Sequence, residues 1–181
     1  MIISELLKSG SKALKLNKIE THQLDSEVVL SNLLKKPREN LIINLNQKVS
    51  KTVVQNFKKL ISRRANREPL AYILKKKEFW SKDFFVDRST LIPRPETELL
   101  CEKIIKIFNN KSLYILDIGT GSGCIILSIL GELKGAKGIG IDISKKAILI
   151  AKKNRSKLDL KKKVKFFNKS IEDVNGCKFD L

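Results

Sequence analysis

The chain has 181 residues, of which 42% are hydrophobic and 31% are charged. This balance is typical of a globular protein rather than a disordered chain, and no apolar stretch approaches the roughly 20 residues that a membrane-spanning helix needs. The only histidine is His22, and the cysteines Cys101, Cys124 and Cys177 are scattered and odd in number. This inventory argues against a disulfide framework or a zinc cluster, so we expect no metal site.

The net charge of +18 is spread over the whole chain. Residues 1–75 hold 15 Lys and Arg against 6 Asp and Glu, and residues 76–181 hold 22 against 13. Nucleic-acid binding proteins gather such charge in one patch. The distribution therefore favours a generally basic surface over a nucleic-acid partner, although the charge leaves that partner open.

Residues 1–74 predict a small helical domain. The N-terminus has an acidic residue, Glu5, and no basic stretch ahead of a long apolar one, so it does not resemble a signal peptide. We expect a cytoplasmic protein with no membrane partner. Asp25 is predicted to be the N-cap of a helix that ends at Pro37, and another helix is predicted to follow Ser50. The apolar positions that follow helical spacing are Ile3, Leu6, Leu7, Leu14, Leu16, Val28, Val29, Leu33, Leu34, Val53, Val54, Phe57, Leu60 and Ile61.

Residues 75–90 predict a β-hairpin linker. Two aromatic and β-branched runs, residues 78–80 and 84–86, are separated by Ser81, Lys82 and Asp83. Pro95 then opens a helix in the next segment, since proline is favoured in a first helical turn. The residues that this helix is predicted to bury are Leu99, Leu100, Ile104 and Phe108.

Residues 91–181 alternate between strand and helix patterns, which predicts an α/β fold with the first half of a Rossmann-like parallel sheet. Such sheets bind ligands at the carboxyl ends of their strands. The predicted strands are residues 113–118, 138–143 and 164–167, with the beginning of a fourth at 179–181, and the predicted helices are 124–133 and 145–154.

A glycine-rich loop joins the first of these strands to its helix. Asp117 ends the strand, and Gly119, Gly121 and Gly123 follow at alternate positions. Glycines allow the backbone amides and the helix N-terminus to approach a ligand closely. The third glycine comes one residue too early for a dinucleotide fingerprint. The acidic Asp117 suits a ligand with an ammonium group, such as the methionine part of S-adenosylmethionine.

Asp142 ends the second strand, 23 positions after Gly119. An acidic residue about 20 positions beyond the glycine loop reaches the ribose hydroxyls in doubly wound nucleotide-binding folds. A simple turn function for both features is the alternative. The combination of loop, preceding acid and second acid in a βαβ setting favours a cofactor site.

The loop from Asp117 to Gly123 resembles the first motif of class I methyltransferases. Residues 67–74, 78–80 and 91–98, the last reading Leu-Ile-Pro-Arg-Pro-Glu-Thr-Glu, are similar to the release factor glutamine N5-methyltransferases. The similarity covers essentially the whole chain. It implies a helical substrate-recognition domain at 1–74, a hairpin linker at 75–90 and a methyltransferase domain at 91–181. The cofactor-binding residues that it implies are Asp117, Gly119, Thr120, Gly121, Ser122, Gly123 and Asp142.

This resemblance implies transfer of a methyl group from S-adenosyl-L-methionine to a glutamine side-chain amide in peptide chain release factors. The catalytic Asn-Pro-Pro-Tyr of the family is absent and is expected beyond Leu181, so no catalytic residue is assigned within the chain. We expect a C-terminally truncated chain that alone binds the cofactor weakly, if at all, and transfers no methyl group. Ser170 and Ile171 stand where some members carry an Asp and an aromatic residue near the adenine.

Two other functions stay open at this point. A nucleic-acid methyltransferase that acts on an adenine amino group would use a related motif and would suit the basic charge. A non-catalytic remnant or interaction module would suit the end of the chain at Leu181. A dehydrogenase is least favoured because of the glycine spacing.

Overall fold

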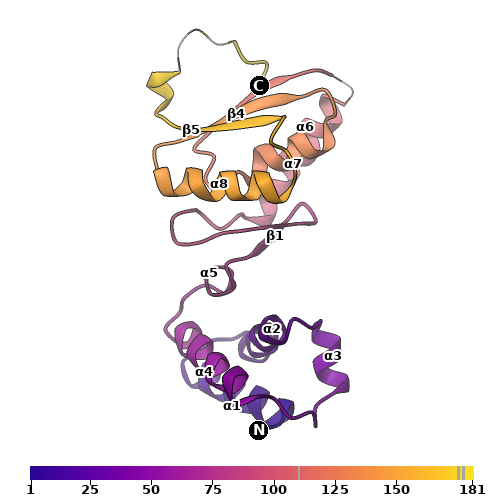
Figure 1. Ribbon diagram of the computed structural model, residues 1–181, viewed down its shortest axis with the longest axis vertical. Coiled ribbons are helices and arrows are strands. Elements are labelled where there is room, and N and C mark those ends of the chain that lie inside the picture. The colour runs from indigo at the N-terminus through magenta and orange to yellow at the C-terminus, as the bar shows by residue number, and fades with distance from the viewer. Residues whose placement is uncertain (110, 175, 177) are drawn as a thin grey trace. The chain divides into compact units, whose positions relative to one another are not determined.

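The computed structural model describes residues 1–109, 111–174, 176 and 178–181. The chain forms two compact units, Met1–Leu74 and Lys75–Leu181 (Figure 1). Cys177, one of the three cysteines considered above, lies outside the described residues. In the described part of the chain, no helix is long and apolar enough to cross a membrane.

The first unit is helical, as its apolar periodicity predicts. Its core is built where α1 and α4 both pack on α2, around the fully buried side chains of Leu6, Leu30 and Phe57. Gly10 allows the close approach of α1, because a Cβ there would lie 2.6 Å from Cζ of Phe57. The helices are α1 (Ile3–Leu16), α2 (His22–Leu34), α3 (Arg38–Ile43), α4 (Lys51–Ala65) and α5 (Leu70–Leu74).

The predicted N-cap role of Asp25 is wrong. The helix α2 begins three residues earlier, at His22, so Asp25 lies inside it and is only 3% exposed. Its carboxylate accepts a hydrogen bond from Nε of Arg64 in α4 at 2.6 Å. A buried carboxylate is tolerated within a helix when it is paired in this way. Pro37 also does not end α2, which stops at Leu34; it directly precedes α3, a helix that the periodicity did not predict.

The second unit opens with the predicted hairpin, which is confirmed. Strands β1 (Lys77–Phe79) and β2 (Lys82–Phe84) pair antiparallel. The turn lies one residue earlier than predicted, at Trp80 and Ser81, whose φ angles of 52° and 51° suit the tight turns that match strand twist. Phe79 and Phe84 meet edge to face beneath it, with ring centroids 6.1 Å apart.

After the hairpin, Pro95 opens a short 3-10 helix, η1 (Pro95–Thr97), which leads into α6 (Glu98–Ile107). The predicted buried face of this helix is partly wrong, because Leu99 and Leu100 are 60% and 48% exposed. Cys101 is fully buried instead. The face toward the core is therefore rotated from the predicted one, toward Cys101 and Ile104.

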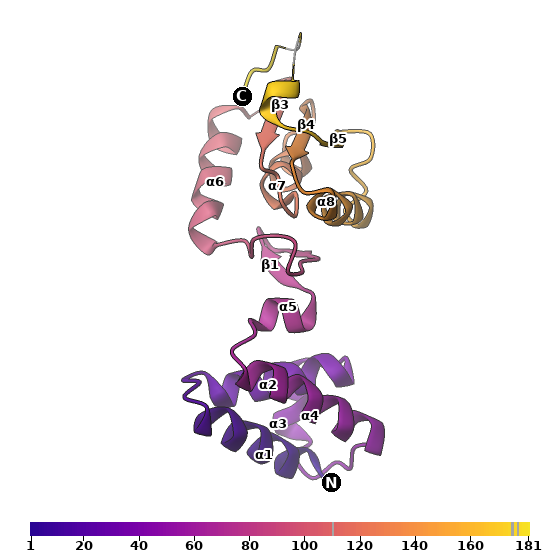
Figure 2. The ribbon, with the colours of Figure 1, turned by 90° about the vertical axis from the view of Figure 1, so that its left-hand side faces the viewer.

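The α/β prediction is confirmed by a parallel sheet in the order β3-β4-β5. The helices α7 and α8 pack against these strands (Figure 1), and α7 lies between α6 and α8 (Figure 2). The side chains of Ile126, Leu127 and Leu130 in α7 are fully buried in this core. The elements are β3 (Tyr114–Ile118), α7 (Cys124–Glu132), β4 (Lys137–Asp142), α8 (Lys145–Lys157), β5 (Val164–Asn168) and η2 (Ile171–Asp173).

Residues 179–181 do not form the predicted fourth strand, but they lie beside β3. The amide of Asp180 donates to the carbonyl of Tyr114, and the amide of Leu116 donates to the carbonyl of Leu181, both at 2.8 Å. The ring of Phe179 stacks on that of Tyr114 with centroids 5.0 Å apart. This segment therefore occupies the free edge of β3.

Candidate cofactor site at the carboxyl ends of the strands

The loop between β3 and α7 takes a backbone form that glycine permits. Gly119, Gly121 and Gly123 have φ angles of 69°, 54° and 79°, in the left-handed region that side chains disfavour. The two ends of the loop differ in their surroundings. A Cβ on Gly123 would lie 3.0 Å from Cδ1 of Leu127, whereas a Cβ on Gly119 would meet nothing within 4 Å. The loop is packed against the core at Gly123 and open at Gly119.

Thr120 connects the loop to the ends of two neighbouring strands, β3 and β4. The hydroxyl of Thr120 donates to Oδ2 of Asp117 at 2.7 Å, and the Thr120 amide donates to the carbonyl of Ile141 at 2.9 Å. Burial raises the pKa of Asp117, and the nearby charge of Asp142 adds to the rise, while hydrogen bonds from Thr120 and the Ile126 backbone oppose it. A carboxylate in this setting gains from a cationic ligand.

Asp142, at the end of β4, fastens the loop to the start of α8. Its Oδ2 accepts from the amide of Gly121 at 3.0 Å, and its Oδ1 accepts from the amide of Ser144 at 2.8 Å. Ser144 then caps α8, with its hydroxyl oxygen accepting from the amide of Ala147 at 3.2 Å. Each carboxylate oxygen keeps a further acceptor position, so a rigidly held Asp142 can still accept from ligand hydroxyls.

Apolar side chains stand exposed around this edge of the sheet. Ile118 follows Asp117 and is 59% exposed, and Ile143 follows Asp142 and is 82% exposed. Ile171, one of the two residues that depart from the family pattern, is 47% exposed, while Ser170 caps η2. Exposed isoleucines beside two acidic groups can cover the face of a flat, apolar ring. Sequence reasoning missed Ile118 and Ile143, although their position next to each acid was visible.

A further residue that sequence reasoning missed is Asn154 in α8. Its side-chain amide donates to the carbonyl of Ser122 at 2.9 Å, and it is only 1% exposed. The signal for it was present, because Asn154 continues the buried stripe of α8 that includes Ala147, Ile150 and Ala151. A polar residue on an apolar helical stripe is informative because burial requires it to have partners.

The other reactive side chains that the structure describes do not assemble into a metal site. Within the described residues there is no group of three or more His, Cys, Asp or Glu side chains that could hold a metal ion. His22 shares a hydrogen bond with Ser11 in the helical unit. Burial raises the pKa of Cys101 to about 12 and that of Cys124 to about 11, so both thiols stay protonated at neutral pH.

Comparisons with known proteins agree with this arrangement. Residues 5–74 match the model of the PrmC N-terminal domain, and residues 109–181 match that of a methyltransferase domain. A crystal structure of a Pyrococcus horikoshii protein classed as a transferase has a TM-score of 0.50 at 14% identity, over 83% of this chain and 66% of that one. The matched model identifies residues 109–181 as a methyltransferase domain.

Two relatives make the similarity more specific. The chain is 42% identical to the release factor glutamine methyltransferase of Buchnera aphidicola from Schizaphis graminum, over 97% of its own length and 63% of the relative's. It is 36% identical to a bifunctional methyltransferase of Rickettsia typhi, over 99% of its length and 38% of the relative's. Over almost its whole length the chain is thus similar to release factor glutamine methyltransferases, and it spans between about two fifths and two thirds of these relatives.

Proposed function

We propose that the chain binds S-adenosyl-L-methionine in the loop after β3, as the cofactor side of a glutamine methyltransferase that acts on peptide chain release factors. The observation that carries the proposal is that one glycine loop is hydrogen-bonded to both acids. The hydroxyl of Thr120 donates to Asp117, and the amide of Gly121 donates to Asp142. The Buchnera and Rickettsia relatives support methyl transfer, and the former supports release factors as its target.

The residues at this edge of the sheet fit the proposed cofactor. Asp117 would pair with the ammonium group of the methionine part, since burial raises its pKa and a nearby cation would offset that cost. Asp142 would accept from the ribose hydroxyls. The open space at Gly119 allows the ligand to contact the backbone closely, and Ile143 would cover the adenine. The cofactor-binding residues proposed are Asp117, Gly119, Thr120, Gly121, Ser122, Gly123 and Asp142.

The cofactor, when bound, supplies a methyl group on a positively charged sulfur, and the glutamine amide nitrogen accepts this group and releases a proton to solvent. The chain's own residues would bind and orient the donor, which contributes to rate by proximity. No Asn-Pro-Pro-Tyr occurs in the 181 residues, so we assign to this chain no residue that holds the amide.

The two units would divide the work. We assign substrate recognition to residues 1–74, which match the PrmC N-terminal domain, and the hairpin at 75–90 would be the linker to the cofactor-binding residues of 91–181. Release factors act in translation, so the site of action would be the cytoplasm. The relatives favour this function over the adenine-amino alternative and over a non-catalytic module.

Cofactor binding can be tested on the ¹⁵N-labelled chain by titration with S-adenosylhomocysteine, a method that detects weak complexes. We expect saturable shifts at the amides of Gly119 and Gly121, and their loss in Asp142→Asn. The matched control is Asp159→Asn, which changes an exposed aspartate after α8. Wild-type chain that shows no saturable shift would overturn the proposed cofactor site.

Substrate binding and methyl transfer need separate measurements. Addition of a release factor is expected to shift the amides of residues 1–74, and shifts confined to 91–181 would contradict the proposed division of work. With labelled S-adenosylmethionine and the release factor, we expect no methyl transfer by this chain. Transfer would show that residues within 1–181 hold the glutamine amide.

A further inference from the structure

The side chain of Asn154 joins two segments that lie far apart in the sequence. Its Nδ2 donates to the carbonyl of Ser122 and to the carbonyl of Phe85, both at 2.9 Å. Its Oδ1 accepts from the amide of Phe85 at 2.7 Å. The carboxamide therefore satisfies both backbone groups of Phe85, as a neighbouring strand would, and extends one further bond to the cofactor loop.

The Ser122 peptide lies near the end of that loop, just before α7. The amide of Gly121 on one side donates to Asp142, and the amide of Gly123 on the other donates to the carbonyl of Thr120 at 2.8 Å. Ser122 itself is only 2% exposed. Fixing its carbonyl therefore fixes the peptide plane between Ser122 and Gly123, where the loop turns into α7.

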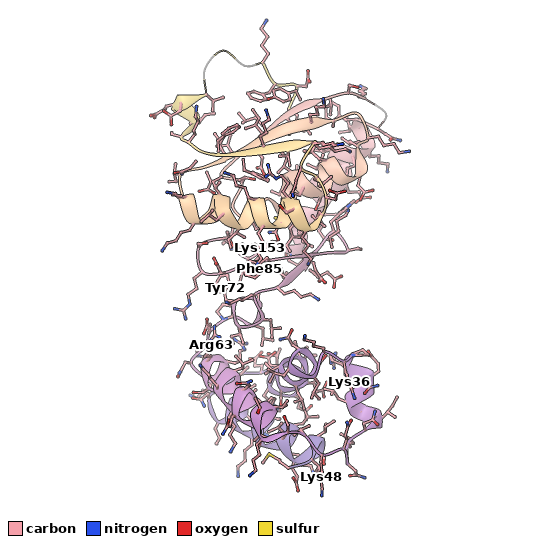
Figure 3. The ribbon with its side chains drawn as sticks, in the orientation of Figure 1. Lys36, Lys48, Arg63, Tyr72, Phe85 and Lys153 are labelled. Carbon is pink, nitrogen blue, oxygen red and sulfur yellow. The ribbon has the colours of Figure 1, made fainter. Side chains whose placement is uncertain are left out.

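Two other side chains of α8 contact the hairpin region. Nζ of Lys153 lies 3.3 Å from the ring centroid of Phe85, and Figure 3 shows these two side chains next to each other. Nζ of Lys157 donates to the carbonyl of Asp83 at 2.6 Å. Lys153 and Lys157 thus contact the end of the hairpin, whereas Asn154 is hydrogen-bonded both to the hairpin end and to the loop.

We propose that Asn154 is a positioning residue that couples the cofactor loop to the end of the hairpin, so that loosening of residues 85–86 opens the loop at Ser122. The proposal rests on the proposed function only in taking this loop as the cofactor site. Through this contact, movement of the linker would alter cofactor affinity. No ligand contact of Asn154 itself is involved.

The chemistry of the three bonds requires a carboxamide. Two backbone carbonyls need donors and one amide needs an acceptor, and a buried group that loses its partner is costly. The substitution Asn154→Asp retains the acceptor but places an oxygen against two carbonyls. It therefore keeps the size of the side chain, removes the donors and adds a negative charge.

Amide hydrogen exchange on the full chain tests this coupling. In Asn154→Asp we expect exchange at Gly121, Gly123 and Phe85 to speed up about tenfold or more, and the affinity for S-adenosylhomocysteine to fall to a similar extent. In the control variants Lys153→Ala and Lys157→Ala, which leave the bonds between Asn154 and Phe85 in place, we expect faster exchange near residues 83 and 84 only, with affinity within about twofold of wild type. Asn154→Ala serves as a second variant without charge repulsion.

The proposal fails if Asn154→Asp leaves loop exchange unchanged, or if the lysine variants speed up the loop as much as it does. If neither Asn154 variant folds, amide exchange in the wild-type chain tests the coupling. Coupled opening predicts that the amides of Phe85 and Gly123 have the same protection factor. A tenfold or larger difference between them would contradict it. If the wild-type chain does not bind S-adenosylhomocysteine, the proposed function is overturned. The exchange data would still show whether the loop and the hairpin end are coupled.

Discussion

The helical unit holds a buried aspartate and the sheet unit a partly buried one, and the surroundings of the two charges differ. Asp25 is paired with Arg64 of α4 at 2.6 Å, and that pair lies inside the helical unit. Asp117 forms no ion pair within the described part of the chain; it accepts from the hydroxyl of Thr120, and burial raises its pKa. The charge of Asp25 is balanced by a cation of its own chain, whereas the charge of Asp117 has hydrogen bonds but no cationic partner in the described residues and can pair with a cationic ligand.

Removal of the partner of Asp25 is expected to have the largest effect. Arg64→Ala would leave a buried charge unpaired, which costs about 3–5 kcal/mol. The measurement is urea unfolding of the helical unit, followed by circular dichroism. Arg38→Ala is the matched control, since its pair with Glu27 is far more exposed and contributes at most about 1 kcal/mol. Equal losses in the two variants would show that burial does not set the difference.

Asp117→Asn is expected to act on binding rather than on folding. It would keep the acceptor for Thr120 but remove the charge offered to the ligand, and hydrogen bonds to charged groups contribute about 1.5–3 kcal/mol. Calorimetric affinity for S-adenosylhomocysteine should fall about tenfold or more. At neutral pH the thermal midpoint should not fall, because the variant removes a charge that burial disfavours. A lower thermal midpoint with unchanged affinity would show that Asp117, like Asp25, acts on folding rather than on binding.

The two ends of the glycine loop should respond differently to an added methyl group. Gly123→Ala would combine a φ of 79° with a Cβ 3.0 Å from Leu127, and a cost of about 2–3 kcal/mol is expected from strain and overpacking. Gly119→Ala has open space, so its cost should be about 1 kcal/mol, from the backbone alone. Affinity should fall in Gly119→Ala, where the ligand approaches. Denaturation and titration of both variants would check this.

The pH dependence of stability gives the smallest expected effect. The pKa of Asp117 is raised in the folded protein, so its contribution to stability is fully present below the unfolded pKa of about 3.9 and is lost as pH rises through the folded value. The variant Asp117→Asn does not lose stability in this way, because asparagine does not titrate. The stability difference between variant and wild type, measured by urea unfolding at several pH values, should therefore grow above about pH 4. A difference that does not change with pH would show that burial does not shift the pKa of Asp117.

The regular elements of the sheet unit follow closely from local patterns. Residues predicted as strands and helices between 113 and 167 lie in β3, α7, β4, α8 and β5 with ends that differ by only a few residues. The hairpin was also predictable, but its turn lies at Trp80 and Ser81 because strand twist favours a two-residue turn there. The exposed faces of α6 were not predictable, since Leu99 and Cys101 differ in burial only through what packs on them.

By itself, the amino-acid sequence determined the glycine loop and the acid at the end of each adjacent strand. These depend on local rules, because positive φ angles require glycine at 119, 121 and 123 and parallel strands end at one edge. Only the tertiary structure decided the roles of Asp25 and Asn154. The partners of these side chains, Arg64 and Phe85, lie 39 and 69 positions away, and no local pattern reports which distant group will satisfy a buried polar atom.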